Sequence, residues 1–178
     1  QAAGHAGKIV VRPPRLADQI GAQQAPPPYA PGPGVQLIVG GTGGFGLATA
    51  LWLAAKGATR VVVASRRGRL EPEALPNVEA LRAAGVTFAV ETVDATSAAE
   101  VEALVARVTA EHGPITGVFH SAMVLDDALL TDLDDVRLSA VLAPKIDGAY
   151  HLDRATRDQP VEQFVLFSSA AALVGNPG

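Results

Sequence analysis

The sequence predicts an α/β protein built on a doubly wound parallel sheet. Five short apolar runs, typical of buried strands, alternate with longer segments of helical periodicity. Hydrophobic residues make up 48% of the chain but aromatic residues only 4%, so the core consists mainly of Ala, Val and Leu. Short connections between strands and helices imply right-handed βαβ units, which place the first strand beside the fourth and open a crevice there. This is the Rossmann type of fold.

Each element is predicted from its own local signals. Unbroken apolar, β-branched runs indicate five strands over Val35–Val39, Arg60–Ser65, Val86–Asp94, Ile115–His120 and Val161–Ser169. Apolar positions three and four apart indicate four helices over Gly44–Lys56, Pro72–Ala84, Ser97–Glu111 and Asp134–Arg157.

The boundaries of these helices carry sequence signals as well. Gly57 and Gly85 stop the first two helices. Ser97 caps the third, with Glu100 placed for a capping box. The fourth helix contains Pro144, which should kink it.

The first 34 residues differ in composition from the rest. Seven of the 13 prolines lie there, five of them in "APPPYAPGPG". We expect residues 12–34 to form a semi-rigid interdomain linker, or alternatively a loop on the domain surface, and residues 35–178 to form the domain. Residues 1–11 hold a short strand, "GKIVVR", expected to close a preceding domain. Without an initiator Met or a signal-peptide core, we expect a segment of a longer cytoplasmic chain.

Composition argues against several function classes. The net charge is −4 and no Lys/Arg stripe is present, so nucleic acid is not an expected partner. The chain has no cysteine, which excludes disulfides and thiolate metal sites, and we predict no metal. No apolar run is long enough to span a bilayer, so no membrane partner is expected either.

A glycine-rich turn lies between the first strand and the first helix. Its sequence is "GGTGGFG", and glycines there let the backbone approach a pyrophosphate that the helix N-terminus then binds. The alternative is a tight turn that binds nothing. We assign the whole turn to a dinucleotide cofactor: Gly40, Gly41, Thr42, Gly43, Gly44, Phe45 and Gly46.

The end of the second strand indicates which dinucleotide is bound. An NAD site carries an acidic residue there for the ribose 2′-hydroxyl. This chain has Ser65, Arg66 and Arg67 instead. Arginine pairs with a 2′-phosphate, so the residues favour NADPH, unless they form a solvated basic turn.

The third and fourth strands add candidates at the same edge of the sheet. Asp94 lies where it could accept a hydrogen bond from the adenine amine, although an ordinary loop aspartate is also possible. His120, Ser121 and Ala122 end the fourth strand beside the expected nicotinamide. His120 alone would more often be a packed histidine.

With these motifs in order, residues 35–178 resemble the ketoreductase domain of a modular, reducing type I polyketide synthase, a short-chain dehydrogenase/reductase. The matching strings are "GGTGGFG", "VVVASRRG", "VFHSAMVLDDALL", "VLAPKIDGAYHL" and "FVLFSSAAALVG". "GHAGKIVV" resembles the last strand of the enoylreductase domain that precedes it. As a whole, the sequence is similar to lipid-making synthases of the mycocerosic acid synthase kind.

The resemblance implies two catalytic residues. Ser169, the second serine of the pair, would donate a hydrogen bond to the substrate carbonyl oxygen. Lys145, of "APK", would bind the cofactor ribose and lower the pKa of a catalytic tyrosine. Taken alone, Lys145 would equally suit a solvent-facing helix position. The tyrosine is expected beyond Gly178, so we expect the domain to be incomplete at its C-terminal end.

The segment after the fourth strand carries a further mark. Leu125, Asp126 and Asp127 resemble the substrate-orienting "LDD" of B-type ketoreductases, which give the 3R-hydroxyl. The A-type tryptophan after the serine is absent. Without the resemblance, Asp126 and Asp127 could equally be solvated residues at the start of a helix. Val39 and Met123 depart from the family, which usually has Thr and Gly there.

The expected function is NADPH-dependent reduction of a β-ketoacyl group carried on an acyl carrier protein by phosphopantetheine, in a synthase that also contains enoylreductase and dehydratase domains. The alternative is a non-catalytic pseudo-ketoreductase portion of the same kind of multienzyme. A scaffold would not need the glycine turn, Ser169 or Lys145. A free-standing fatty-acid-type reductase conflicts with the linker and the enoylreductase-like start.

Overall fold

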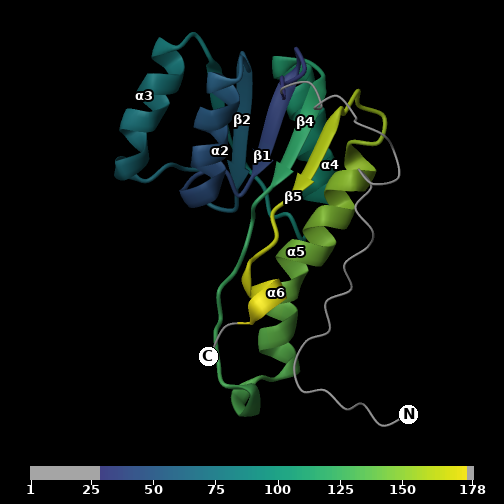
Figure 1. Cartoon of the computed structure of the whole chain (residues 1–178). Coiled ribbons are helices and arrows are strands. Elements are labelled where there is room, and N and C mark those ends of the chain that lie inside the picture. Colours follow the sequence, from purple (N-terminus) through teal and green to yellow (C-terminus); the bar gives the residue numbers. More distant parts are fainter. Residues whose placement is uncertain (1–28, 176–178) are drawn as a thin grey trace, which may run out of the picture.

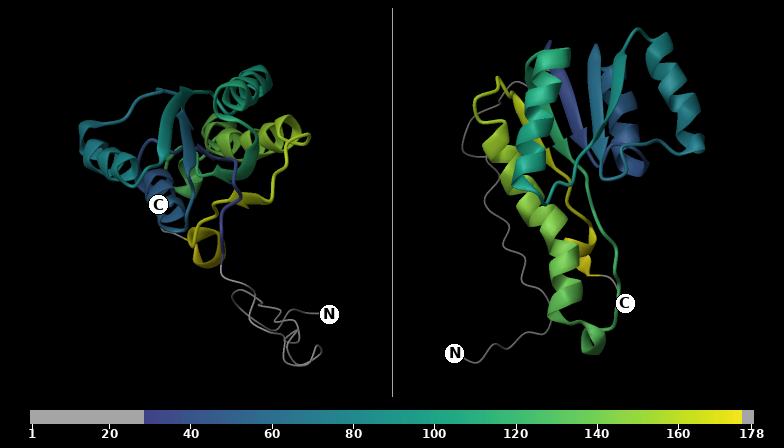
Figure 2. Two further views of the ribbon diagram at one scale, coloured as in Figure 1. Left: turned by 90° about the horizontal axis from the view of Figure 1, so that it is seen from above. Right: turned by 180° about the vertical axis from the view of Figure 1, so that it is seen from behind.

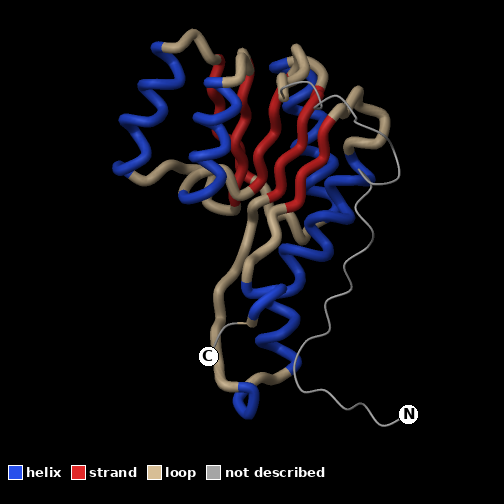
Figure 3. The backbone as a smooth tube through the Cα atoms, viewed as in Figure 1, coloured by secondary structure: helices blue, strands red, loops and turns tan. Residues whose placement is uncertain are grey.

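A computed structural model describes residues 29–175 of the chain. The expected closing strand over residues 1–11 and most of the expected linker lie outside the described residues. The fold centres on one five-stranded sheet, and every neighbouring pair of strands is parallel (Figures 1 and 3). The strand order is β3-β2-β1-β4-β5. The strands are β1 (Val35–Val39), β2 (Arg60–Ser65), β3 (Thr87–Thr92), β4 (Ile115–His120) and β5 (Gln163–Leu166).

Helices cover both faces of this sheet (Figure 2). One face packs against α4 (Ala98–His112) and α5 (Asp135–Ala155), through residues such as Leu37, Leu104 and Leu152. The other packs against α2 (Gly44–Ala55) and α3 (Leu75–Ala83), the latter preceded by the 3-10 turn η1 (Pro72–Ala74). Successive side chains of a strand point to opposite faces, so Leu37 and Ile38 enter different cores. The predicted doubly wound fold is confirmed, with β1 beside β4.

The predicted strands are present but two are shorter than expected. β5 ends at Leu166 because its partner β4 ends at His120, and the last bond between them runs from the Phe167 amide to the His120 carbonyl, at 3.0 Å. β3 begins at Thr87 rather than Val86, because the Val86 amide donates to the Leu81 carbonyl near the end of α3. After β5 the chain forms the short helix α6 (Ala171–Val174), which the sequence does not predict.

The helix caps follow the predicted signals in part. Ser97 accepts the Glu100 amide at 3.4 Å, as a capping box requires. The Glu100 carboxylate, however, accepts the amide of Asp94 rather than that of Ser97. Pro144 lies inside α5, and Asp134 caps that helix by accepting the Arg137 amide at 2.8 Å.

β5 forms one edge of the sheet. Phe164, Val165 and Leu166 are all exposed. Beside them a hollow of about 510 Å³ opens between β5 and α2; it is lined mostly by apolar side chains, namely Tyr29, Phe45, Ala48, Thr49, Trp52, Phe119, Gln163, Val165 and Phe167. Among residues 29–175, no helix combines the length and apolarity needed to cross a membrane.

Residues 29–34, the end of the expected linker, lie against the domain. The Tyr29 ring stacks on Trp52 with 4.7 Å between ring centroids. Gly32 and Gly34 are buried, and a Cβ on Gly34 would stand 2.3 Å from the Pro114 carbonyl oxygen. Buried Gln36 donates to the Gly32 carbonyl oxygen at 3.2 Å. These six residues therefore contact the domain.

Candidate functional site

The glycine turn joins β1 to α2 through contacts that exclude side chains. Gly40 has a φ of +86°, and its amide donates to the Ala64 carbonyl at 2.8 Å. A Cβ on Gly46 would stand 2.4 Å from both the Gly40 carbonyl oxygen and the Gly41 Cα. A Cβ on Gly41 would meet Val63 at 2.7 Å. These glycines therefore let the turn close tightly over the ends of β1 and β2.

The outer part of the same turn is open. A Cβ on Gly43 or Gly44 would meet nothing within 4 Å. α2 begins with no side-chain cap and no acidic residue in its first turn. Within the described chain, the amides of Thr42, Gly43, Gly44 and Phe45 have no hydrogen-bond acceptor. A helix start with free amides, partial positive charge and open space in front of it is suited to a phosphate group.

The two arginines after β2 differ in their surroundings. Arg67 forms an ion pair with Glu71 at 2.6 Å. Arg66 is exposed, forms no ion pair within residues 29–175, and lies near enough to Asp94 to lower the pKa of that carboxyl. Ser65 accepts the Gly68 amide through its hydroxyl at 3.3 Å, which closes the turn that carries both arginines.

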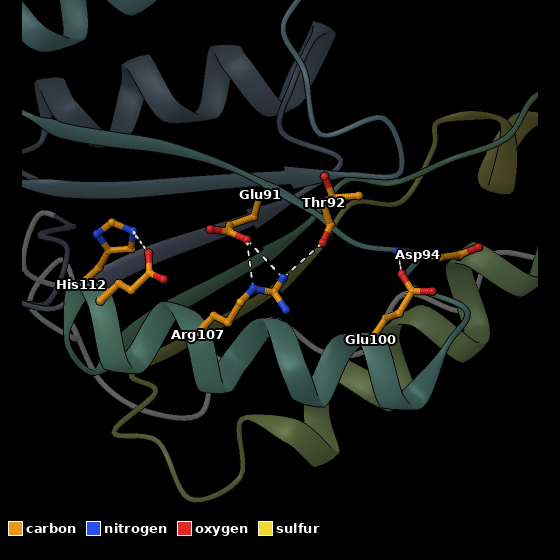
Figure 4. A network of polar contacts seen from close by, with 7 residues as sticks. Glu91, Thr92, Asp94, Glu100, Arg107 and His112 are labelled. Atoms are coloured by element: carbon orange, nitrogen blue, oxygen red, sulfur yellow. Dashed lines mark hydrogen bonds and ion pairs between the residues drawn. The ribbon is translucent and has the colours of Figure 1, made fainter.

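Asp94 follows β3 at the same edge of the sheet. Hydrogen bonds from the Thr96 amide and the Thr96 hydroxyl are the main cause of its lowered pKa. Figure 4 shows how α4 supports this end of β3: Glu100 accepts the Asp94 amide at 2.8 Å. Arg107 pairs with Glu91 at 3.1 Å and donates to the Thr92 carbonyl. Asp94 therefore stays ionised, on a braced backbone, where a hydrogen-bond acceptor is expected.

The ends of β1 and β4 are in contact at the switch point. The amide and hydroxyl of Ser121 both donate to the Val39 carbonyl, at 2.8 and 3.2 Å. A Cβ on Gly40 would stand 2.4 Å from the Ala122 amide nitrogen. The Val39 side chain itself is buried in the core. Met123, the other departure from the family pattern, is more than half exposed.

His120 is packed rather than open to the crevice. Its side chain is buried, and its Nε2 lies 2.7 Å from the Pro144 carbonyl oxygen, the geometry of a donated hydrogen bond. Gly148 leaves room for the ring, since a Cβ there would stand 2.9 Å from Nε2. Burial lowers the pKa of His120, the Pro144 hydrogen bond opposes this, and the Lys145 charge lowers the pKa further. His120 is therefore a packed histidine, and it joins β4 to α5.

Lys145 and Ser169 come from different elements. Lys145, on α5, is half-buried, and its Nζ donates to the Phe167 carbonyl at 3.0 Å. Ser169 follows β5 and is exposed; its Oγ accepts the Ala171 amide at 3.1 Å. The Lys145 bond therefore ties α5 to the segment that carries the serine. Lys145 therefore does not simply face solvent.

The three residues of the "LDD" string are not equivalent. Asp126 forms an ion pair with Arg137 of α5 at 2.8 Å. Leu125 and Asp127 are exposed, and Asp127 has no ion pair in the part of the chain that the structure describes. The partners of Asp126 and Lys145 were not found from the sequence, because neither Arg137 nor the Phe167 carbonyl carries a motif. Phe45 also lies 6.4 Å from Phe167, ring to ring, across the mouth of the turn.

The described residues contain no group of three or more His, Asp or Glu side chains that could hold a metal ion. The groups that they do bring to one edge of the sheet are free amides, an arginine, an ionised aspartate, a lysine and a serine. This set can bind an anionic dinucleotide and donate hydrogen bonds to a carbonyl oxygen.

Comparison with known proteins agrees with this chemistry. The family model for the KR domain matches residues 34–178. Polyketide synthase GfsA of Streptomyces halstedii is 46% identical over 145 residues, which are 82% of this chain and 2% of that protein. The mycocerosic acid synthase-like polyketide synthase of Mycobacterium tuberculosis is 40% identical over 180 residues, 99% of this chain and 8% of that protein.

Solved structures show the same likeness. A-type ketoreductases from a modular polyketide synthase share 39% identity with a TM-score of 0.76, over 88% of this chain and 34% of theirs. A ketoreductase from the first module of phoslactomycin biosynthesis in Streptomyces sp. HK803 shares 36% identity with a TM-score of 0.76. The match covers 84% of this chain and 34% of that one. The chain thus spans about a third of these solved domains and under a tenth of the synthases.

Proposed function

This chain belongs to the KR domain family of polyketide synthases, and on that premise we propose that it is the cofactor-binding part of an NADPH-dependent reductase for β-ketoacyl groups carried on an acyl carrier protein. The glycine turn is the observation that carries the proposal. Its inner glycines are packed so closely that no side chain fits, while its outer glycines face open space beside four free amides. A turn that only connected β1 to α2 would need the close packing of the inner glycines, but not the open space and free amides of the outer ones.

The residues present fit a phosphorylated dinucleotide. The amides of residues 42–45 would bind the pyrophosphate, Arg66 the 2′-phosphate and Asp94 the adenine amine. No acidic side chain ends β2, where a 2′-hydroxyl would otherwise be bound. Arg66 supports NADPH more directly than Arg67 does, because Arg67 already shares its charge with Glu71.

The chemistry of reduction divides between the cofactor and the protein. NADPH supplies the hydride when bound. Ser169 has a hydroxyl proton free to donate to the ketone oxygen, since its Oγ serves as an acceptor toward the Ala171 amide. Lys145 adds a positive charge beside the Ser169 segment, which favours an anionic oxygen there and a lower pKa in a neighbouring tyrosine. In this proposal that tyrosine, the general acid, lies beyond residue 178.

The relatives support a proposal about partners. The mycobacterial relative and the phthioceranic/hydroxyphthioceranic acid synthase of Mycobacterium bovis match 99% of this chain, whereas the match to GfsA covers 82%. We propose that the chain lies in a synthase with a carrier protein, a dehydratase and a preceding enoylreductase domain, of which residues 1–11 are the end.

We also propose the 3R-alcohol as product. The solved neighbours include A-type ketoreductases, so the fold alone does not distinguish the types. The proposal rests on Leu125–Asp127 and on the lack of tryptophan after Ser169; the one tryptophan, Trp52, is on α2.

One experiment tests function and product together. The complete reductase domain of the parent polypeptide is given NADPH and a β-ketoacyl thioester on a carrier protein, and the hydroxyacyl product is separated by chiral chromatography. We expect ketone-dependent oxidation of NADPH and mainly the 3R product. A mainly 3S product would contradict only the B-type assignment. NADPH binding without any reduction would favour the non-catalytic alternative.

A further inference from the structure

The segment between β4 and α5 carries the substrate-orienting residues, and we propose that Arg137 is the residue that positions it. The inference rests on the proposed function, since it concerns how the ketone is presented in the same site. Arg137 itself touches neither cofactor nor substrate in this proposal. It acts through Asp126.

Few contacts hold this segment in place. Residues 121–134 contain one 3-10 turn, η2 (Leu130–Asp132), and no longer element. Their apolar side chains are largely exposed, Leu125 to 72% and Leu130 to 86%. Packing therefore does little to fix the segment.

The ion pair supplies a fixed point. Arg137 Nη1 and Asp126 Oδ1 are 2.8 Å apart, and both side chains are about 40% exposed. Across residues 29–175 it is the only ion pair that joins the segment to α5. The pair joins residues eleven positions apart in the sequence, and so restricts the conformations that Asp126 and its neighbours can adopt.

Arg137 is itself held in a defined position. Its amide donates to the N-capping carboxylate of Asp134 at 2.8 Å, so it belongs to the first turn of α5. The same helix carries Lys145 about two turns later. One continuous helix, with Pro144 inside it, therefore carries both the partner of Asp126 and Lys145. The contact between Pro144 and His120 joins that helix to β4.

The two aspartates can then have different roles. Asp126 has its carboxylate occupied by Arg137 and serves as the anchor. Asp127 and Leu125, both exposed, remain free to meet an incoming acyl chain. Figures 1 and 2 show the segment leaving β4 alongside the segment that leaves β5, with α5 next to both. Ser169 lies on the latter, so movement of residues 125–127 changes the shape of the space in front of the serine.

The test uses the complete reductase domain with Arg137→Gln and Asp126→Asn. We expect each to lower the ratio of major to minor alcohol by a factor of about two to five, the size expected for loss of a half-exposed ion pair. We expect the KM of the ketoacyl substrate to rise by a similar factor. The Kd of NADPH should not change, because its phosphates are bound at the ends of β1 and β2. The double variant should be no worse than either single variant.

Arg157→Gln is the matched control. Arg157 pairs with Asp153 at the same distance, 2.8 Å, near the other end of α5. Its removal should leave product ratio, KM and Kd at wild-type values. If Arg137→Gln does not fold, the reversed pair Asp126→Arg with Arg137→Asp restores the contact, and its product ratio should lie near that of the wild type.

The outcomes separate the two proposals. A wild-type domain that reduces ketones, with Arg137→Gln and Asp126→Asn variants of unchanged product ratio and KM, would overturn the positioning role and leave the proposed function standing. A reversed pair that folds but gives an unselective product would overturn it as well. A wild-type domain that reduces no ketone would overturn the proposed function, and this inference with it.

Discussion

Arg66 and Arg67 are adjacent in the sequence but differ in electrostatic surroundings. Arg67 forms an ion pair with Glu71, while Arg66 has no ion pair within the described residues. We expect Arg66→Ala in the complete domain to weaken NADPH binding by about 10- to 100-fold, the value of a charge-assisted pair of roughly 1.5–3 kcal/mol, and to leave NADH binding nearly unchanged. Arg67→Ala, the control, should have a smaller effect. Fluorescence titration with both cofactors measures this, and equal losses for NADPH and NADH would contradict the assignment.

Substitutions of Gly43 and Gly46, in the same turn, should have different effects, one on cofactor binding and the other on folding. A Cβ on Gly46 would collide with the backbone of Gly40 and Gly41, so Gly46→Ala should lower the free energy of unfolding by about 1–3 kcal/mol, as overpacking does. Gly43 has an extended φ of −165° and open space around it, so Gly43→Ala should fold normally. Its methyl group would nevertheless occupy the approach of the phosphates. Thermal unfolding and NADPH titration of both variants test this, and a Gly43→Ala protein with wild-type affinity would contradict the phosphate site.

At the scale of elements, β4 and α5 are joined by His120, and this contact should depend on pH. Burial lowers the pKa of His120 in the folded protein below its ordinary 6.5. Below about pH 6.5 the unfolded chain therefore binds a proton that the folded chain does not, and stability falls as the pH falls. We expect His120→Gln, which keeps a donor for the Pro144 carbonyl, to reduce this pH dependence. Denaturant unfolding of the complete domain at a series of pH values measures it.

His151→Gln, on the same helix, is the control for this measurement. It removes a partly exposed histidine whose ring lies edge-on to the exposed ring of Tyr150. A His120→Gln variant whose stability falls with pH as steeply as that of the control would show that another group is responsible.

For the whole molecule, the proposed mechanism assigns proton donation to a tyrosine outside residues 1–178. Ser169 and Lys145 can polarise a ketone, but a general acid typically contributes about 10²–10⁴-fold to the rate. We expect the 178-residue protein to show no measurable ketone reduction. Extension through the complete domain should restore it, and the first tyrosine after Gly178, changed to Phe in that protein, should abolish turnover while NADPH still binds. Robust turnover by the 178-residue protein would mean that a residue already present is the acid.

The same extension should raise stability. Phe164, Val165 and Leu166 leave an apolar strand exposed at the edge of the sheet, next to the hollow lined by Phe45 and Phe167. An exposed apolar edge favours association between chains. We expect the 178-residue protein to aggregate more readily and to unfold at a lower temperature than the complete domain, as light scattering and calorimetry would show. Equal stability of the two would contradict this.

The strand order, the glycine turn and the site edge were predictable because they depend on local patterns. Apolar runs specify the strands, and the handedness of βαβ units then brings Gly40, Arg66 and Asp94 to one edge. The bond from Lys145 to Phe167, the pair between Asp126 and Arg137, and the burial of His120 were not predictable. Each is a long-range contact that depends on how α5 packs, and this helix buries only Gly148 and Leu152, so its sequence pattern is weak.

Gly32 and Gly34 fix the side from which the polypeptide enters the domain. They bring the arriving polypeptide onto the domain next to Pro114 and Thr116, where β1 and β4 begin. Ser169, Lys145 and the glycine turn lie where the strands end. Residues 29–34 and the proposed site thus lie at opposite ends of the sheet. In the proposed synthase, the polypeptide would enter the domain on the side away from the site, and a carrier-bound substrate would approach from the other side.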